Sequence, residues 1–284
     1  MLIDTKPQTF SDLVRISGLS HGTDVWLNNA QTVILNGDAT ISTAICTRDD
    51  IMIYLINKGL ESEQSFTIME SVRKGKGLKP EWIEEMKKHD VPQWYIDSCL
   101  KIKYMFPKAH AAAYVMMAYR IAYFKVFYPL AYYAAYFSIR ASAFSYEYMC
   151  MGRERLEYYM ADFKKRKETK QLSNKEEDML KDMKLVQEMY ARGFEFEPID
   201  LYRVAAHKFQ IFGNKLMPAL STIEGMGDKA AGAVVDAALD GPFLSKDDLR
   251  ERSKASKTVV DLMDDLGILG DIPESNQISL FDFM

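Results

Sequence analysis

The sequence predicts a mainly α-helical protein with few or no β-strands, in which a large helical region precedes a smaller one. Apolar residues recur at the three- and four-residue spacing of amphipathic helices through much of the 284 residues. The stretch from Ala109 to Phe127 is apolar on every face, which is typical of a helix buried on several sides. One stretch, 192–210, has an extended pattern.

Helices and loops alternate in the first part of the chain. Turn-forming residues fill the segment from Ser17 to Asp24, so we expect a loop there. Residues 73–79 hold four cations and two glycines, which favours a loop over a helix. The helices expected around these loops cover 25–35, 48–56, 63–72, 80–88 and 93–104.

The later elements follow from prolines and from a change in composition. Pro107 suits the first turn of the apolar helix, and Pro129 ends that helix before a second one over 130–140. Residues 151–190 are rich in Lys, Glu and Met at helical spacing. Two short helical units are then expected, over 222–238 and 244–266.

Composition and charge exclude several classes of protein. Hydrophobic residues make up 48% of the chain and charged residues 27%, so the bulk of it is globular rather than disordered. The net charge of −4 gives no overall positive field that would attract nucleic acid. The longest uncharged run, 126–139, is shorter than the roughly 20 residues of a membrane span.

The cysteines and the first residues indicate where the protein works. Cys46, Cys99 and Cys150 lack metal-ligand spacing, and their odd number argues against a disulfide framework. The first six residues lack the basic and apolar regions of a signal peptide. We therefore expect a cytoplasmic protein with no membrane association.

A Gly-x-Gly hairpin is the first motif that carries chemistry. Gly225, Met226 and Gly227 join an apolar segment to a helix that contains Lys229, which is the helix-hairpin-helix pattern. Glycines permit positive φ and let backbone N–H groups approach a phosphate, so the motif predicts duplex DNA binding. The alternative is an αα-hairpin whose glycines only cap helices. Residues 253–269 resemble a second copy without the glycines.

Two basic segments could bind a nucleotide. Arg73, Lys74 and Lys76 lie on the glycine-containing loop, where cations can meet phosphate oxygens; on charge alone a solvated turn is favoured. Lys108 lies in the first turn of the apolar helix. His110 and Tyr114 share one face of that helix and could stack on a base. By chemistry alone they are more often core residues.

The C-terminal peptide predicts a docking motif. Gln277, Ser279, Leu280 and Phe281 follow an acidic linker that contains a proline, and the two apolar side chains could enter a partner's pocket. The alternative is a terminus that packs on its own domain. Elsewhere, adjacent acids such as Asp49–Asp50 have the positions of helix caps. The sequence therefore predicts no catalytic residue and no metal site in this chain.

Taken together, these stretches resemble the C-terminal region of the bacterial replicative DNA polymerase III alpha subunit of the PolC type. The resemblance runs through essentially all 284 residues. The segments that carry it in the first half are 10–26, 45–50, 70–77 and 106–114. Those that carry it in the second half are 192–198, 225–227, 241–243 and the terminal peptide.

The resemblance implies a four-part organisation. It places a helical polymerase fingers region at 1–150, a helical connector at 151–191, a tandem helix-hairpin-helix duplex-binding domain at 192–270, and a flexible tail with a sliding-clamp-binding peptide at 271–284. The residues implied for nucleotide binding are Arg48, Arg73, Lys74, Lys76, Lys108, His110 and Tyr114. Those implied for DNA binding are Gly225, Met226, Gly227 and Lys229.

The family's chemistry lies outside this chain. Its catalytic carboxylates, its palm and its Mg²⁺ ions precede this region, so the chain is expected to be a fragment that is inactive by itself. The implied partners are dNTP, primer-template duplex DNA, a sliding clamp and the N-terminal remainder of the polymerase. The alternative is a non-catalytic DNA- and clamp-binding module. The first 150 residues distinguish the two, because a plain duplex binder would not need them.

Overall fold

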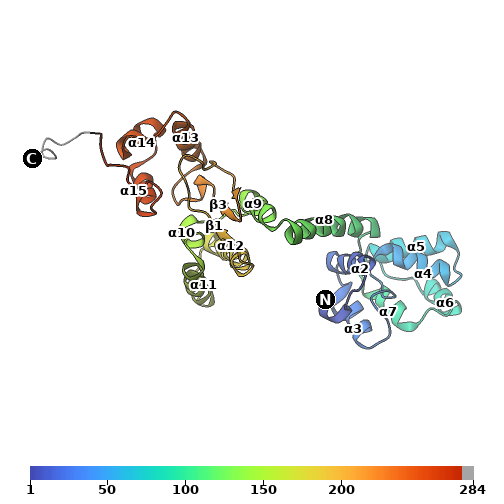
Figure 1. Ribbon diagram of the computed structural model, residues 1–284. Helices are drawn as coiled ribbons and strands as arrows, with labels where there is room; N and C mark the ends of the chain where they lie inside the picture. Colours follow the sequence, from blue (N-terminus) through green and yellow to red (C-terminus); the bar gives the residue numbers. More distant parts are fainter. Residues whose placement is uncertain (277–284) are drawn as a thin grey trace, which may run out of the picture. The chain divides into compact units, whose positions relative to one another are not determined.

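The computed structural model describes residues 1–276 and divides into two compact units (Figure 1). Unit 1 is Met1–Ala122 and unit 2 begins at Tyr123. The prediction of a mainly α-helical chain is confirmed, because the strands among the described residues form one small sheet. The predicted division at residues 150, 191 and 270 stays a prediction.

The regular elements of unit 1 are helices. Its helices are α1 (Leu2–Thr5), α2 (Phe10–His21), η1 (Trp26–Ala30), α3 (Gln31–Leu35), α4 (Arg48–Asn57), α5 (Ser62–Arg73), α6 (Pro80–Lys88), α7 (Gln93–Lys101) and most of α8 (Lys108–Phe127). The predicted helices over 48–56, 63–72 and 80–88 are confirmed. Pro80 begins α6, where its missing N–H leaves no bond unmade. α4 and α5 pack side by side and bury Ile51, Leu55 and Ile68 completely.

The loop predicted from Ser17 to Asp24 is wrong for its first five residues, which continue α2 to His21. A capping box at Thr9 and Asp12 starts this helix. Gly18 lies inside the helix because the backbone of Cys46 passes so close that a Cβ would lie 2.5 Å from its carbonyl oxygen. The glycine therefore serves close packing and not a turn.

Two further helix predictions need correction. The helix predicted over 25–35 begins as the irregular η1, with Asn28 at φ 56°, and only α3 is regular. The cause is the buried Asn29, whose amide donates to the carbonyl of Ser98 at 3.2 Å and accepts from its hydroxyl at 2.5 Å. The helix predicted over 93–104 ends at Lys101, since Tyr104 pairs with Thr23 in an isolated β-bridge.

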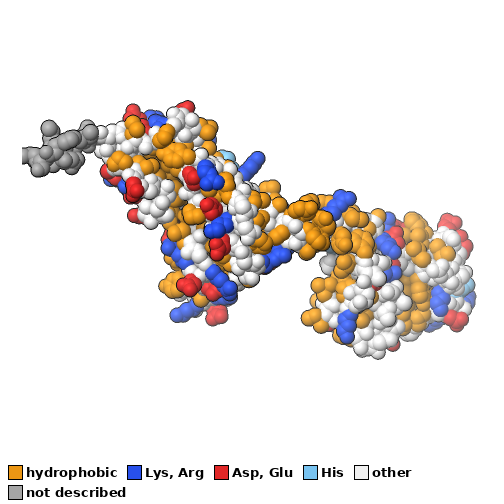
Figure 2. Space-filling view, in the orientation of Figure 1, with side chains coloured by type: hydrophobic (Ala, Val, Ile, Leu, Met, Phe, Trp, Pro, Cys, Tyr) orange, Lys and Arg blue, Asp and Glu red, His pale blue; other side chains and the backbone are white. Residues whose placement is uncertain are grey.

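Helix α8 differs most from its expectation. The sequence predicts burial on several sides, yet the buried residue of α8 is Ala111. Tyr114, Met117 and Tyr119 are 55–59% exposed. Within unit 1 the helix meets α2 along one side, where the ring centroids of Tyr119 and Phe10 are 5.9 Å apart. Figure 2 shows hydrophobic side chains along the surface of this helix.

Unit 2 combines helices with the small sheet. Its elements are α9 (Pro129–Ile139), α10 (Tyr146–Met149), α11 (Arg153–Glu168), α12 (Asn174–Ala191), β1 (Glu195–Phe196), β2 (Gln210–Phe212), β3 (Lys215–Met217), η2 (Leu220–Thr222), α13 (Asp228–Leu239), α14 (Lys246–Ser253) and α15 (Lys257–Asp265). The strand order is β1-β3-β2; β1 runs parallel and β2 antiparallel to β3. Within the segment 192–210, predicted as extended, the strand residues are therefore 195–196 and residue 210, where β2 begins.

Two hydrophobic cores stabilise unit 2. One joins α9, α11 and α12 to the sheet around the fully buried Leu156, Met183 and Leu216. The other lies among the last helices and buries Val234 and Met263 completely. The region 151–190 is two helices, because the turn 169–173 separates α11 from α12.

Candidate functional site

Three of the predicted nucleotide-binding cations gather around one carboxylate in unit 1. Arg73 donates from Nε to Oε1 of Glu70 at 2.5 Å and from Nη2 to Oε2 at 2.9 Å. Lys74 Nζ lies 2.9 Å from Oε2, and Arg48 Nη1 lies 3.3 Å from Oε1. The hydrogen bonds from Arg73 and Lys74 lower the pKa of Glu70 to about 2. We call these four residues the Glu70 cluster.

Sequence reasoning did not find Glu70. A signal was available, because Arg73 and Lys74 follow Glu70 at i+3 and i+4, the spacing of neighbours on one helix face. The long-range partner Arg48 begins α4 and had no such signal. Lys76, the remaining predicted cation of this loop, is exposed beyond the end of α5.

Backbone hydrogen bonds attach the segment 103–108 to the Glu70 cluster. The N–H of Arg48 donates to the carbonyl of Phe106 at 3.2 Å, and the carbonyl of Arg73 accepts from Met105 at 3.2 Å. The N–H of Lys108, in the first turn of α8, donates to the carboxylate of Asp49 at 2.6 Å. These bonds bring α8 to the cations although the two lie far apart in sequence.

An aromatic face continues from this segment. The rings of Phe106 and His110 stack with centroids 4.6 Å apart, and Tyr114 lies 4.6 Å from His110. The predicted shared face of His110 and Tyr114 is therefore present. Tyr114 is 56% exposed, so the core interpretation is wrong for it. His21 completes the face, with its ring centroid 5.3 Å from that of Tyr114. Sequence reasoning missed His21, because Ser17–Asp24 was predicted as a loop.

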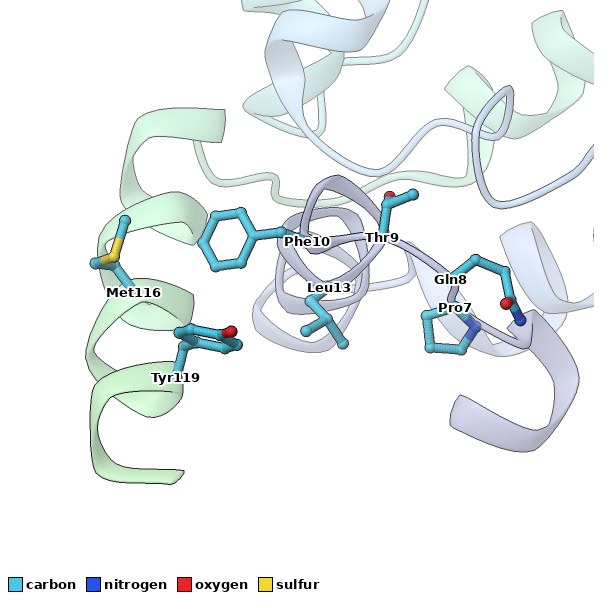
Figure 3. Close-up of a pocket in the computed structure, with 7 residues that line it drawn as sticks. All are labelled: Pro7, Gln8, Thr9, Phe10, Leu13, Met116 and Tyr119. Carbon is cyan, nitrogen blue, oxygen red and sulfur yellow. The ribbon is translucent and has the colours of Figure 1, made fainter. Parts of the chain in front are cut away.

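An apolar groove between α2 and α8 opens beside the aromatic face. One hollow of about 510 Å³ is lined by side chains such as Phe10, Leu13 and Tyr119 (Figure 3). A second hollow of about 470 Å³ shares Leu13 and Tyr119 and reaches His21 and Tyr114. The exposed aromatic face therefore borders a concave surface and is not an isolated patch.

The predicted Gly-x-Gly hairpin is present in unit 2. Gly225 has φ 76°, which favours glycine, and Met226 is buried with 5% exposure. Gly227 has φ −69°, so the positive φ that glycines permit is used at Gly225 and not at Gly227. As the N-cap of α13, Gly227 offers no side chain to the first N–H groups of that helix, and Lys229 is exposed in the same turn.

The second hairpin has the same backbone form without glycine. Lys254 takes a left-handed conformation at φ 58°, and Ala255 is buried with 7% exposure. Ser256 then caps α15 with φ −68°, against −69° for Gly227. The segment that looks degenerate by composition therefore keeps the geometry. Unlike Gly227, Ser256 accepts a bond from Val259, which satisfies one N–H of its helix.

Two kinds of site are not found in residues 1–276. No group of three His, Cys, Asp or Glu side chains in this range could hold a metal ion, so the residues present do not fit the Mg²⁺ of the resembled family. No helix of the same range is long and apolar enough to cross a membrane. The predicted clamp-binding residues Gln277, Ser279, Leu280 and Phe281 lie outside the described residues.

Comparison with known proteins shows what the chain is similar to. Residues 1–90 match the finger domain of the bacterial DNA polymerase III alpha subunit, and residues 193–278 match a helix-hairpin-helix motif. DNA polymerase III PolC-type from Halalkalibacterium halodurans is 56% identical over 281 residues. The chain matches a segment of the PolC-type DNA polymerase III family. The relative from Bacillus subtilis is 55% identical over the same length.

These PolC-type relatives are much longer than the chain. The matches cover 99% of this chain but 20% of the Halalkalibacterium protein and 19% of the Bacillus protein. The chain thus spans about one fifth of the length of the curated relatives it matches. Within this chain, the Glu70 cluster falls in the part that matches the finger domain, and both hairpins fall in the part that matches the helix-hairpin-helix motif.

Proposed function

We propose that this segment works in a replicative DNA polymerase, where unit 1 orients the incoming dNTP and unit 2 grips the product duplex. The observation that carries the first part is the attachment of the aromatic face to the Glu70 cluster through residues 103–108. A nucleotide presents a flat base at one end and a triphosphate at the other. Aromatic rings stack on bases, and Arg and Lys bind phosphate oxygens.

The two hairpins support the second part. Helix N-termini with open N–H groups bind phosphate, and the first turn of α13 has no capping side chain. Contacts of this kind fix a duplex in place without reading its sequence. We therefore expect binding that is independent of sequence and falls steeply with salt.

The transfer reaction is assigned to residues outside this chain. We propose that Mg²⁺ and the catalytic carboxylates belong to the part of the polymerase that the chain does not cover, and that primer extension requires that part. The protein would act in the cytoplasm, where the three free cysteines stay reduced. Purified chain should give no primer extension with Mg²⁺.

A second candidate is a non-catalytic module that binds DNA and a clamp. The hairpins favour it equally, because they need no palm to bind a duplex. The Glu70 cluster and the aromatic face favour the polymerase, since the hairpins would bind a duplex without them. The module would be favoured if the chain binds duplex DNA and if Arg73→Ala has no effect on nucleotide use.

The terminal peptide would join either protein to a sliding clamp. We propose that Leu280 and Phe281 enter a hydrophobic pocket of the clamp while Gln277 hydrogen-bonds beside it. The double variant Leu280→Ala, Phe281→Ala should lose clamp binding by calorimetry and keep its DNA affinity. Equal clamp binding by this variant would contradict the assignment.

Steady-state kinetics test the nucleotide site. In a full-length PolC-type polymerase that carries this segment, Arg73→Ala should raise KM for dATP about tenfold, because a charge-assisted contact to phosphate is lost. Lys108→Ala should act in the same direction. Lys87→Ala is the matched control, since Lys87 pairs with Glu84 on α6 at 3.3 Å and lies outside the Glu70 cluster. An unchanged KM in folded Arg73→Ala would overturn the proposed nucleotide site.

A further inference from the structure

The Glu70 cluster has more positive than negative charge. One carboxylate faces the cationic groups of Arg48, Arg73 and Lys74, all within 3.3 Å. Glu70 is mostly buried, with its side chain 20% exposed. Without it, the three like charges would repel one another and their long side chains would separate. The three cationic groups therefore stay close together only because Glu70 lies between them.

The cations keep unused donors. A guanidinium has five N–H groups, and Arg73 gives Glu70 only those on Nε and Nη2. Arg48 makes one long bond to Glu70 through Nη1, and its Nε is buried with no hydrogen-bond partner among the described residues. A buried N–H without a partner is unfavourable, so Arg48 is incompletely satisfied in this state.

We propose that Glu70 is a positioning residue of the nucleotide site, which holds Arg48, Arg73 and Lys74 together so that their free donors meet the triphosphate at once. The proposal rests on the function proposed above. Glu70 does not itself contact the nucleotide. It removes the need to collect three flexible cations when the nucleotide binds, and preorganised donors bind an anion more tightly than scattered ones.

The sign of the effect separates positioning from simple charge. If Glu70 were only a negative charge near the triphosphate, its removal would reduce repulsion and lower KM for the nucleotide. If it positions the cations, its removal raises KM. The two explanations therefore predict opposite changes for the same substitution.

The test uses Glu70→Gln and Glu70→Asp in a full-length PolC-type polymerase that carries this segment, with dATP as substrate. We expect Glu70→Gln to raise KM about tenfold, the effect of losing one charge-assisted contact, while kcat changes much less. Glu70→Asp keeps the charge and should recover part of the loss. Glu85→Gln is the control, because Glu85 on α6 pairs with Lys88 and with His89, the residue after this helix, and neither belongs to the cluster.

Arg73→Ala separates the two proposals. If Arg73→Ala raises KM while Glu70→Gln leaves it unchanged or lowers it, the role of Glu70 is overturned and the nucleotide site stands. If Arg73→Ala has no effect, the nucleotide site itself fails. If Glu70 acts through Arg73, the double variant should be little worse than Arg73→Ala alone. Should Glu70→Gln lose its cooperative melting transition, Glu70→Asp is judged instead: a raised KM supports the role, and an unchanged KM overturns it.

Discussion

The candidate sites of the two units are built from different parts of the chain. In unit 1 the groups that would bind a nucleotide are side chains, and other side chains hold them: Glu70 fixes the cations and His21 completes the aromatic face. In unit 2 the groups that would meet phosphate are backbone N–H groups, positioned by the left-handed residues Gly225 and Lys254.

The difference predicts different sensitivities to substitution. A side-chain site responds to single changes of charge and ring, which suits a ligand that has to be recognised. A backbone site responds to changes of φ or of space near the chain, and it tolerates changes of side chain. This explains why the second hairpin can replace glycine by Lys254 and keep its form.

The largest expected effect comes from a glycine of unit 1. A Cβ on Gly75 would lie 2.4 Å from the carbonyl oxygen of Lys103, whereas a Cβ on Gly77 meets nothing closer than 3.9 Å. Both have nearly the same positive φ. Gly75→Ala should therefore lower the free energy of unfolding by about 3 kcal/mol, and Gly77→Ala by about 1 kcal/mol. All three tryptophans lie in unit 1, so fluorescence during urea unfolding reports on it. Equal losses would show that no close approach holds the segment 103–108.

In the first hairpin, substitutions of the two glycines should have different effects. Gly225→Ala forces a non-glycine residue into φ 76° and should cost about 1–2 kcal/mol in unit 2 by calorimetry. Gly227→Ala has an ordinary φ and no neighbour within 4 Å, so it should lose less stability, about 0.5 kcal/mol, because alanine is a poorer N-cap than glycine. Its duplex affinity should fall, because the added Cβ stands where the backbone approaches phosphate. A stability loss in Gly227→Ala as large as that in Gly225→Ala would contradict this division of roles.

The pKa values of two carboxylates are shifted in opposite directions, which allows a test by pH. Burial raises the pKa of Asp182 to about 6, although the N–H of Ala143 donates to it at 3.3 Å. The folded state therefore loses stability as pH rises from about 4 through 6. Asp182→Asn should stabilise unit 2 by about 1–2 kcal/mol at pH 7.5 and have little effect at pH 3.5.

The lowered pKa of Glu70 has the opposite effect on how stability depends on pH. Its contribution to unit 1 is present above the ordinary pKa and is lost as pH falls through about 2. Thermal unfolding of Asp182→Asn and Glu70→Gln across this pH range checks both signs. A stabilisation by Asp182→Asn that is equal at both pH values would refute the burial effect.

The smallest expected effect concerns the second hairpin. Lys254→Gly should be more stable than Lys254→Ala by about 1 kcal/mol or less, because glycine relieves the left-handed conformation and loses part of that gain to its own flexibility. The alanine variant is the matched control, since both remove the same amine. Chemical denaturation followed by circular dichroism measures the difference. A less stable glycine variant would argue that φ at this position does not matter.

Local signals predicted most helices and the first hairpin. Pro80 and the capping box at Thr9 mark helix starts that the structure keeps. The errors come from tertiary contacts that no local pattern contains. Gly18 looked like a turn residue because its close neighbour, Cys46, lies in another segment, and the exposed length of α8 could not be read from its apolar composition.

The candidate site was predicted only in part, because its contacts also join segments that lie far apart in the sequence. Arg73, Lys108 and Tyr114 were chosen by residue type and resemblance, and the structure brings their segments together through backbone bonds to Phe106 and Met105. Their partners Glu70 and His21 were missed, since neither belongs to a motif that names its contact. Side chains that only position other side chains are difficult to predict from a single sequence.

The most direct test is whether nucleotide use and duplex binding can be impaired separately, one by a substitution in unit 1 and the other by a substitution in unit 2. KM for dATP and Kd for primer-template duplex should be measured in the same full-length PolC-type polymerase with Arg73→Ala or Gly227→Ala. We predict that Arg73→Ala raises KM about tenfold and leaves Kd for duplex unchanged, whereas Gly227→Ala weakens duplex binding and leaves KM unchanged. If each substitution changes both constants together, the assignment of nucleotide to unit 1 and duplex to unit 2 is wrong.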